Sequence, residues 1–251
     1  MSSNNIATFL IIGMAGSGKT TFAQRLVSWI LSKEKNINQR INNLSIRENN
    51  IVNMIEIVNL DPAVVNTKIP PTIDIRDHFD IKEIMKKYNL GVNGAIISCL
   101  NMFLMKDISY CDKKYSVIDT PGQIEAFIWC SASEIILKSI KNPIICYIID
   151  MNCFNMHSFM SNLIFASALH ERYNVRTILV FNKSDKNNCN NIDDLLDYEY
   201  IRNITNTEDL TDIGTLSTYF EEFYKKLEKI KVSSITGEGK HAFFEQILNK
   251  L

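Results

Sequence analysis

The sequence predicts an α/β fold in which a mostly parallel sheet is covered on both faces by helices. Short apolar, β-branched runs recur along the chain, and most of them are followed by a segment with helical periodicity. A glycine-rich loop separates the first apolar run from the first helical segment. Strands that alternate with helices in this way are typical of a parallel sheet. With 251 residues, the chain suits one large domain, which we expect to span residues 1–251.

The order of the apolar and periodic segments places each expected element. Strands are expected at residues 7–12, 51–60, 115–118, 144–149, 177–181 and 231–234. Helices are expected at residues 21–32, 81–89, 95–105, 155–172, 216–230 and 239–251. Residues 33–50 are rich in Asn and charge, which predicts a mobile insertion. A basic RNA-reading loop is the alternative there, but Glu34 and Glu48 dilute its charge. A helical insertion is expected over residues 187–229.

The segment GMAGSGKTTF, directly after the first expected strand, fits the phosphate-loop pattern G-x-x-x-x-G-K-[ST]. Glycines let backbone N–H groups close on a phosphate, and the following helix N-terminus adds partial positive charge. Lys19 can neutralise outer phosphate oxygens, and the Thr20 hydroxyl can ligate Mg²⁺. A chance Gly-rich turn is the alternative, expected in roughly one per cent of unrelated chains from average residue usage. The motif in this context predicts a P-loop NTPase.

Two acidic motifs follow later strands. Asp61 ends the second expected strand, where ligands bind in open α/β sheets, although a turn or helix cap is the alternative. The string Asp119-Thr120-Pro121-Gly122-Gln123 comes at the end of the third. An aspartate there can hold Mg²⁺, and the Gly122 N–H can point at a γ-phosphate. Gln123 lies where a side-chain amide can orient an attacking water.

A third motif, Asn182-Lys183-Ser184-Asp185, follows the apolar run at 177–181 and indicates the base. A carboxylate can accept hydrogen bonds from both N1–H and the N2 amine of guanine, whereas adenine leaves it unpaired. The stem of Lys183 can lie on the purine face while Asn182 braces the loop. The small-residue loop at 233–237 can place a backbone N–H near the guanine O6. Asp150 ends the preceding apolar run.

Composition restricts the remaining classes of function. A net charge of −1 gives no support for a general nucleic-acid or membrane surface. Six cysteines without regular spacing indicate reduced thiols in a cytosolic or nuclear protein. The apolar run at 7–12 is too short to span a membrane and leads into the glycine loop, so it predicts a core strand rather than a signal peptide.

The ordered motifs GMAGSGKTT, NLDPAV, LGVNGAI, DTPGQIEAF, FNKSD and SSITGEG resemble those of the GPN-loop GTPases. These are dimeric P-loop GTPases of the group that includes the signal-recognition and MinD-like proteins. The resemblance extends from Ile6 to about Leu251. IDIRD and DTPGQIEAFIWCSAS are most similar to the eukaryotic branch implicated in RNA polymerase II assembly and nuclear import.

The resemblance implies GTP and Mg²⁺ as ligands, and roles for residues matched by position. The phosphates and the metal would be bound by Gly13, Gly16, Ser17, Gly18, Lys19, Thr20 and Thr21, with Thr20 and Asp119 on the metal. The chemistry on the metal and water would involve Asp61, Asp119, Gln123 and Glu125, together with Lys19. Guanine would be read by Asn182, Lys183 and Asp185, with Ser233 and Ser234 beside them. Asn93 matches the loop asparagine that reaches the partner's active site.

Two departures from the family pattern matter, one in the loop that carries Asn93 and one after the last motif. Gly91-Val92-Asn93 replaces Gly-Pro-Asn, so the loop loses the fixed φ of proline, and we picture Asn93 on a flexible hairpin. Met14 occupies the place of the extra lysine of MinD-like proteins. Arg76 is a candidate arginine finger, but its position in the sequence gives no support for that role. We also expect the long polar tail of the closest branch to be missing after the last motif.

The leading interpretation is a GTP-binding and GTP-hydrolysing switch that assists assembly and nuclear import of RNA polymerase II. An ATPase of the same fold and a non-hydrolysing GTP-bound scaffold are the alternatives. The expected partners are a second copy or a paralogous GPN-loop GTPase, and RNA polymerase II subunits or assembly factors. We expect the protein in the cytoplasm, with nuclear shuttling left open, and expect neither a membrane nor nucleic acid as a direct partner.

Overall fold

The computed structural model describes residues 5–42, 54–65, 67, 69–106, 111, 113–152, 156–186, 223 and 227–248. Within this part of the chain, one seven-stranded sheet has the order β3-β2-β4-β1-β5-β6-β7, and every neighbouring pair is parallel. The strands are β1 Ala7–Gly13, β2 Ile55–Asn59, β3 Ile73–Asp74, β4 Tyr115–Asp119, β5 Pro143–Asp150, β6 Arg176–Asn182 and β7 Glu228–Lys231. The predicted parallel α/β fold is confirmed.

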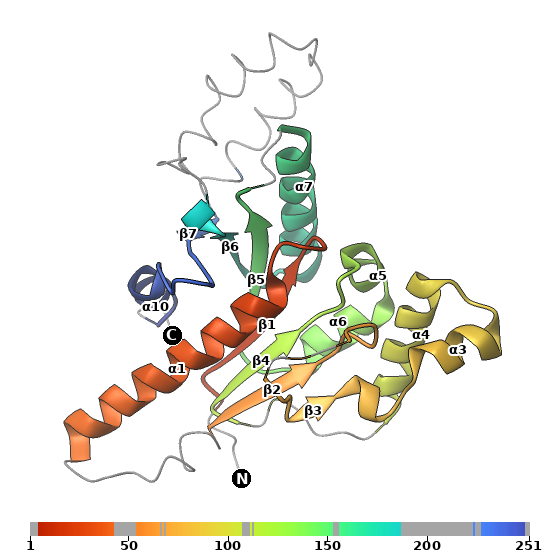
Figure 1. The fold of residues 1–251 in the computed structure, drawn as a ribbon, viewed down its shortest axis with the longest axis horizontal. Coiled ribbons are helices and arrows are strands. Elements are labelled where there is room, and N and C mark those ends of the chain that lie inside the picture. The colour runs from red at the N-terminus through yellow and green to blue at the C-terminus, as the bar shows by residue number, and fades with distance from the viewer. Residues whose placement is uncertain are drawn as a thin grey trace.

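Helices cover both faces of this sheet (Figure 1). They are α1 Lys19–Asn42, α3 Ile81–Tyr88, α4 Val92–Leu104, α5 Ile124–Ile128, α6 Ser131–Ser139, α7 Met156–Tyr173 and α10 Lys240–Leu248, with 3-10 turns η1 Ile75–Asp77 and η2 Ser184–Lys186. Helices α1 and α10 lie over one face, and α4 to α7 lie over the other. Because side chains alternate along a strand, Phe9 and Ile11 of β1 enter the core under α1, whereas Leu10 and Ile12 enter the opposite core.

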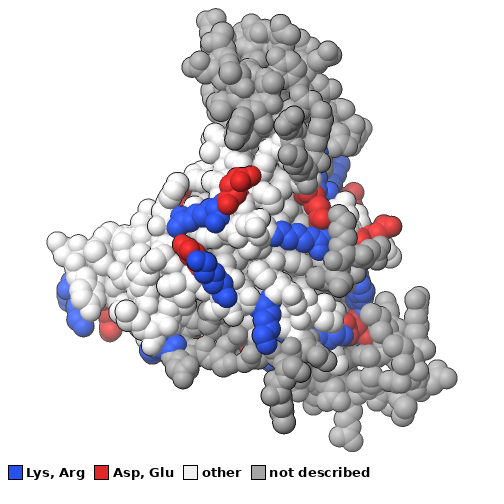
Figure 2. All heavy atoms as spheres, turned by 180° about the vertical axis from the view of Figure 1, so that it is seen from behind, with Lys and Arg blue, Asp and Glu red and all other residues white. Residues whose placement is uncertain are grey.

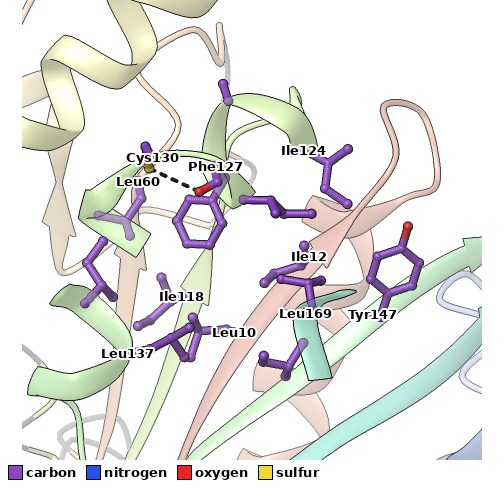
Figure 3. Close-up of a cluster of buried hydrophobic side chains, with 14 of the residues drawn as sticks. Leu10, Ile12, Leu60, Ile118, Ile124, Phe127, Cys130, Leu137, Tyr147 and Leu169 are labelled. Atoms are coloured by element: carbon purple, nitrogen blue, oxygen red, sulfur yellow. Dashed lines mark hydrogen bonds between the residues drawn. The ribbon is translucent and has the colours of Figure 1, made fainter. Parts of the chain in front are cut away.

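The core under α4 to α7 lies directly behind the motif-bearing strand ends. Figure 3 shows Ile12, Ile118 and Tyr147 from three neighbouring strands in one buried cluster with Phe127 of α5 and Leu169 of α7. Cys130 reinforces the end of α5, because its thiol Sγ donates to the Phe127 carbonyl at 3.1 Å. The strand ends that carry the site therefore rest on a fully packed layer.

Helix α1 is longer than the sequence predicts. Residues 33–42 continue the helix instead of beginning a mobile insertion, and residues 43–50 lie outside the described part. Glu34 explains the continuation. Its side chain is 3% exposed, and it accepts hydrogen bonds from Lys114 Nζ at 2.7 Å and the Tyr115 hydroxyl at 3.0 Å. The charge of Glu34 thus belongs to a buried polar contact with Lys114 and with Tyr115 of β4.

The last strand is also displaced from its predicted place. It spans Glu228–Lys231, not residues 231–234, so the end of the helix expected at 216–230 is wrong. Ile230 is buried in the sheet between partly exposed lysines, which is the alternation of a strand. The helical insertion expected at 187–229 otherwise lies almost wholly outside the described residues.

Two surface findings complete the description. On the face shown in Figure 2, Lys and Arg side chains are interspersed with Asp and Glu among the described residues. In the same described part, no helix is long and apolar enough to cross a membrane.

The packing of α10 gives a stability prediction. The Phe243 ring contacts the rings of Phe9, Phe22 and Trp29 and is fully buried, so Phe243→Ala should cost about 3–5 kcal/mol of unfolding free energy. Phe244→Ala is the matched control, because it removes the same atoms from a partly buried position. Urea unfolding at constant temperature measures both, and equal losses would contradict this account of the α10 core.

Candidate nucleotide-binding site

The motif residues gather at the carboxyl ends of the parallel strands, which is where open α/β sheets bind ligands. The glycine loop follows β1, the Asp119 motif follows β4, and the Asn182 motif follows β6. Strand β1 lies between β4 and β5 in the sheet, so the loop after it is central among these segments. Three motifs far apart in sequence therefore meet at one edge.

Two glycines of the phosphate loop are required by close approach. A Cβ at Gly13 would lie 2.5 Å from the Ile148 carbonyl oxygen of β5. A Cβ at Gly18, where φ is +90°, would lie 2.5 Å from Asn182 Nδ2. Neither distance is compatible with a side chain, so the loop can take this path against β5 and β6 only with glycine at both positions.

Lys19 points back into its own loop. Its ammonium donates to the carbonyl oxygens of Gly13 and Met14, both at 2.9 Å. Burial lowers the pKa of this ammonium, and the nearby carboxylates of Asp119 and Asp61 oppose the shift. A cation buried inside a glycine loop is placed to meet an anionic ligand there.

Thr20 and Asp119 form the part of the site that fits a metal ion. The Thr20 hydroxyl donates to Asp119 Oδ2 at 2.8 Å, while Asp119 Oδ1 is buried and has no hydrogen-bond partner among the described residues. Burial raises the pKa of the Asp119 carboxyl to about 6; Asp61 adds to the shift, and Thr20 and Lys19 oppose it. A hydroxyl and an unsatisfied carboxylate oxygen are hard oxygen donors of the kind that Mg²⁺ takes, so these two residues fit that ion.

Asp61 connects the two acidic motifs. Its Oδ2 accepts the backbone N–H of Gly122 at 3.1 Å, and its Oδ1 accepts the N–H of Ala63 at 2.9 Å. The Gly122 N–H, which we expected to face a γ-phosphate, is thus held by Asp61 in this structure. Gln123 is the exposed N-cap residue of α5, and Glu125 is exposed in the first turn of that helix.

A polar network behind Asp61 was not found from the sequence. Buried Asn59 accepts the Asp61 N–H through Oδ1 and donates to Asp74 Oδ1 at 2.8 Å. Arg76 pairs with Asp74 at 2.6 Å and also donates to the carbonyls of Val64 and Val65. Burial opposes ionisation of Asp74, but the Arg76 hydrogen bonds hold the pKa of that carboxyl below its usual range. Arg76 therefore holds the loop after Asp61 in place. Its guanidinium is engaged in these contacts and is not positioned to act as an arginine finger.

The expected base-reading loop is held by the buried amide of Asn182. Its Nδ2 donates to the Ser17 carbonyl of the phosphate loop at 3.0 Å, and its Oδ1 accepts from the backbone N–H and hydroxyl of Ser234. The Ser233 hydroxyl donates to Asp185 Oδ1 at 2.6 Å. The Asp185 side chain remains exposed, which leaves the carboxylate available to a ligand.

The 233–237 loop differs in detail from the expectation. The N–H groups of Ser233 and Ser234 donate to the Glu238 carbonyl and to Asn182 Oδ1, so these serines support the base-reading residues through contacts within the chain. Arg25 of α1 fixes the loop from the other side by donating to the Ser234 and Ile235 carbonyls. Neither Arg25 nor Asp150, which pairs with Lys183, was selected from the sequence.

Asn93 does not lie on a hairpin. Gly91 is the N-cap of α4, and Val92 and Asn93 are its first two helical residues, all three of them exposed. Helix α4 packs against α3, α5 and α6. Proline is favoured at the first helical position, because its fixed φ suits the helix and its missing N–H has no intrahelical acceptor there. The sequence predicts that the loop is less ordered without proline. Helix α4 instead fixes the backbone of Val92 and Asn93.

The fold and the site define a P-loop nucleotide-binding protein. A family described as "Conserved hypothetical ATP binding protein" matches residues 11–251. "GPN-loop GTPase 1" of Dictyostelium discoideum is 34% identical over 95% of this chain and 60% of its own length. The Schizosaccharomyces pombe protein of that name is 33% identical over 96% and 68%. The chain belongs to the GPN-loop GTPase family.

A further relative agrees with this assignment, and a solved structure has a similar fold. "GPN-loop GTPase QQT2" of Arabidopsis thaliana is 32% identical over 94% of this chain and 62% of its own length. The crystal structure of a GTPase in apo form from Pyrococcus abyssi has a TM-score of 0.69 at 22% identity and covers 99% of this chain and 98% of its own. That similarity supports the fold. The chain spans about 60 to 68% of the length of these curated relatives.

Proposed function

We propose that this chain binds GTP and hydrolyses it with Mg²⁺ as a dimeric switch. The observation that carries the proposal is the position of the Asn182-Lys183-Ser184-Asp185 loop. Its asparagine is hydrogen-bonded to the phosphate loop, while its aspartate is exposed beside it. One nucleotide can then meet the phosphate loop and the carboxylate together.

The exposed carboxylate favours guanine over adenine, despite the ATP-binding wording of the matched family description. Asp185 can accept from N1–H and the N2 amine of guanine, whereas adenine offers no such pair of donors. The Ser233 hydroxyl holds Asp185 Oδ1 and so limits its rotation. The names of the relatives, which call them GTPases, agree with this choice.

For hydrolysis, the chain supplies the groups that surround the outer phosphate. Thr20 and Asp119 would hold Mg²⁺, which when bound neutralises charge developing on the phosphoryl oxygens. Lys19 adds positive charge from within the loop. Gln123, exposed at the start of α5, is the candidate to orient the attacking water, with Asp61 and Glu125 supporting the metal and water. These roles rest on the motif chemistry and on family membership.

The dimer in this proposal rests on Asn93. A transferred phosphoryl group needs charge stabilisation beyond one lysine and one metal, and Arg76 is engaged with Asp74 and two carbonyls. Asn93 is an exposed amide on the first turn of a packed helix, so it could be presented rigidly to a second subunit. The partner would be a second copy or a paralogous GPN-loop GTPase.

The cellular part of the proposal rests on sequence resemblance. IDIRD and DTPGQIEAFIWCSAS resemble the eukaryotic branch implicated in RNA polymerase II assembly and nuclear import. We accordingly propose RNA polymerase II subunits or their assembly factors as clients, and residence in the cytoplasm with transfer to the nucleus. Affinity capture from the native cell, with mass spectrometry of co-purified subunits, tests this part; capture without any polymerase subunit or assembly factor would contradict it.

Asp185→Asn tests the choice of base. The variant should lose about tenfold or more in GTP affinity and gain affinity for xanthosine triphosphate, because xanthine carries an oxygen where guanine carries the N2 amine. Competition binding with GTP, XTP and ATP measures the change. A wild-type chain that binds ATP as tightly as GTP would refute guanine selectivity.

Gln123→Ala tests hydrolysis. Because the side chain acts on water, turnover should fall by about tenfold or more while GTP affinity changes little. Single-turnover phosphate release with Mg²⁺ present, and again with EDTA, gives the rate and its dependence on the metal. Equal rates in variant and wild type would remove Gln123 from the mechanism, and no turnover in either would favour a GTP-bound scaffold.

Asn93→Ala tests action across a dimer. The variant should turn over more slowly while still binding GTP, whereas Val92→Pro, at a helix position that accepts proline, should turn over at least as fast as wild type. Light scattering with a GTP analogue and the candidate partner reports the oligomeric state. A chain that stays monomeric and hydrolyses GTP at the normal rate would rule out this arrangement.

A further inference from the structure

An ion pair ties three segments of the site together beside the base-reading residues. Lys183 Nζ donates to Asp150 Oδ2 at 2.5 Å and to the Gly16 carbonyl of the phosphate loop at 2.9 Å. Lys183 lies directly after β6, and Asp150 ends β5. The lysine therefore joins the base loop, the phosphate loop and the central sheet, and Asp150 supplies the negative charge of this contact.

Asp150 is itself fixed by its neighbours. It lies opposite Asn182 in the pairing of β5 with β6, and the next residue, Met151, donates its N–H to the Asn182 carbonyl at 3.1 Å. Asp150 Oδ1 accepts the Asn152 N–H at 2.9 Å, which leaves Oδ2 directed to the lysine. One carboxylate oxygen closes a turn, and the other holds the ammonium.

The lysine backbone shows that this position is constrained. Lys183 has φ +66°, in the left-handed region that a residue with a Cβ adopts only when its surroundings hold it there. Its long side chain has several rotatable bonds, and their rotamer entropy must be lost when the stem becomes ordered against a ligand. A carboxylate that holds the far end of the stem removes part of this cost before any ligand arrives.

We propose that Asp150 is a positioning residue for guanine-nucleotide binding, which acts by holding the Lys183 side chain in place for the purine. This inference rests on the proposed binding of guanine nucleotides. Asp150 lies outside the three motifs. Part of the guanine-nucleotide affinity that Lys183 provides would therefore depend on Asp150. Asp150 acts only through Lys183, so its effect must disappear when the lysine ammonium is absent.

The experiment is a double-mutant cycle on GDP binding. Asp150→Asn keeps the size of the side chain and the oxygen that accepts the Asn152 N–H, but it removes the charge from the lysine. GDP dissociation constants and dissociation rates are measured for wild type, Asp150→Asn, Lys183→Met and the double variant. Asp150→Asn should weaken GDP binding about five-fold, mainly through faster dissociation. In the Lys183→Met background the same change should have no further effect.

The chain offers a matched control for a purely structural role. Arg176 and Glu228 join β6 to β7 at 2.9 Å, with side-chain exposures of 23% and 20%, close to the 26% and 14% of Lys183 and Asp150. Glu228→Gln therefore removes a comparable ion pair far from the strand ends that bear the motifs. It should leave GDP affinity unchanged, whatever it does to the unfolding midpoint.

A second readout separates positioning from base recognition. Inosine lacks the N2 amine that Asp185 is proposed to read, but it has the same purine face. Asp150→Asn should therefore weaken GDP and IDP binding by the same factor, whereas Asp185→Asn should change their ratio. Asp150→Glu, which keeps the charge, should bind GDP more tightly than Asp150→Asn.

The outcomes are distinct. Wild-type affinity in Asp150→Asn, an undiminished effect in the Lys183→Met background, or an equal loss of affinity in Glu228→Gln would each overturn the positioning role and leave the proposed function intact. A wild-type chain that binds no GDP would overturn the proposed function itself, and this inference with it.

Discussion

The buried amide of Asn182 holds together the phosphate loop, the base-reading loop and the 233–237 loop. It donates to the Ser17 carbonyl of the phosphate loop and accepts from the N–H and hydroxyl of Ser234. These contacts join segments that are far apart in sequence, so they fix the loops relative to one another. Gly18 has to be glycine because that amide occupies the space a Cβ would need. One side chain thus determines both the path of the phosphate loop and the place of the base loop.

The opposite half of the site has a comparable organiser in Asn59. Its amide joins Asp61 to Asp74, and Asp74 in turn holds Arg76 against the carbonyls of Val64 and Val65. Two buried asparagines at strand ends, one on β2 and one on β6, therefore order the loops on either side of the phosphate loop. Buried amides suit this task because each has both donors and acceptors and can satisfy two loops without a net charge.

How much the sequence could predict depends on whether the determinants are local. Three features follow from short sequence motifs. These are the position of each motif at the end of a strand, the glycine loop, and the contact of Thr20 with Asp119. The hold of Arg76 on the Val64 and Val65 carbonyls and the pairing of Asp150 with Lys183 depend on contacts between separate segments, so no pattern within one stretch indicates them.

The errors at element ends have the same origin. Residues 33–42 looked like a solvated loop because of their charge, yet Glu34 is buried against Lys114 and Tyr115 of another element. Residues 228–230 looked like the end of an amphipathic helix, yet they pair with β6 and belong to the last strand. In both cases a contact between residues far apart in sequence determines the local conformation. Local helix or strand propensity carries no information about such a contact.

The length of α1 has a mechanical consequence. The helix begins at Lys19, inside the phosphate loop, and its 24 residues extend about 35 Å at 1.5 Å per residue. A tilt of about 5° at the phosphate loop would displace the far end by about 3 Å. Such a tilt would also shift Glu34 against Lys114 and Tyr115, which hold the helix part of the way along its length. A helix that begins in the phosphate loop is thus a rigid arm, through which a small rearrangement at the loop would become a larger movement at a distant part of the surface.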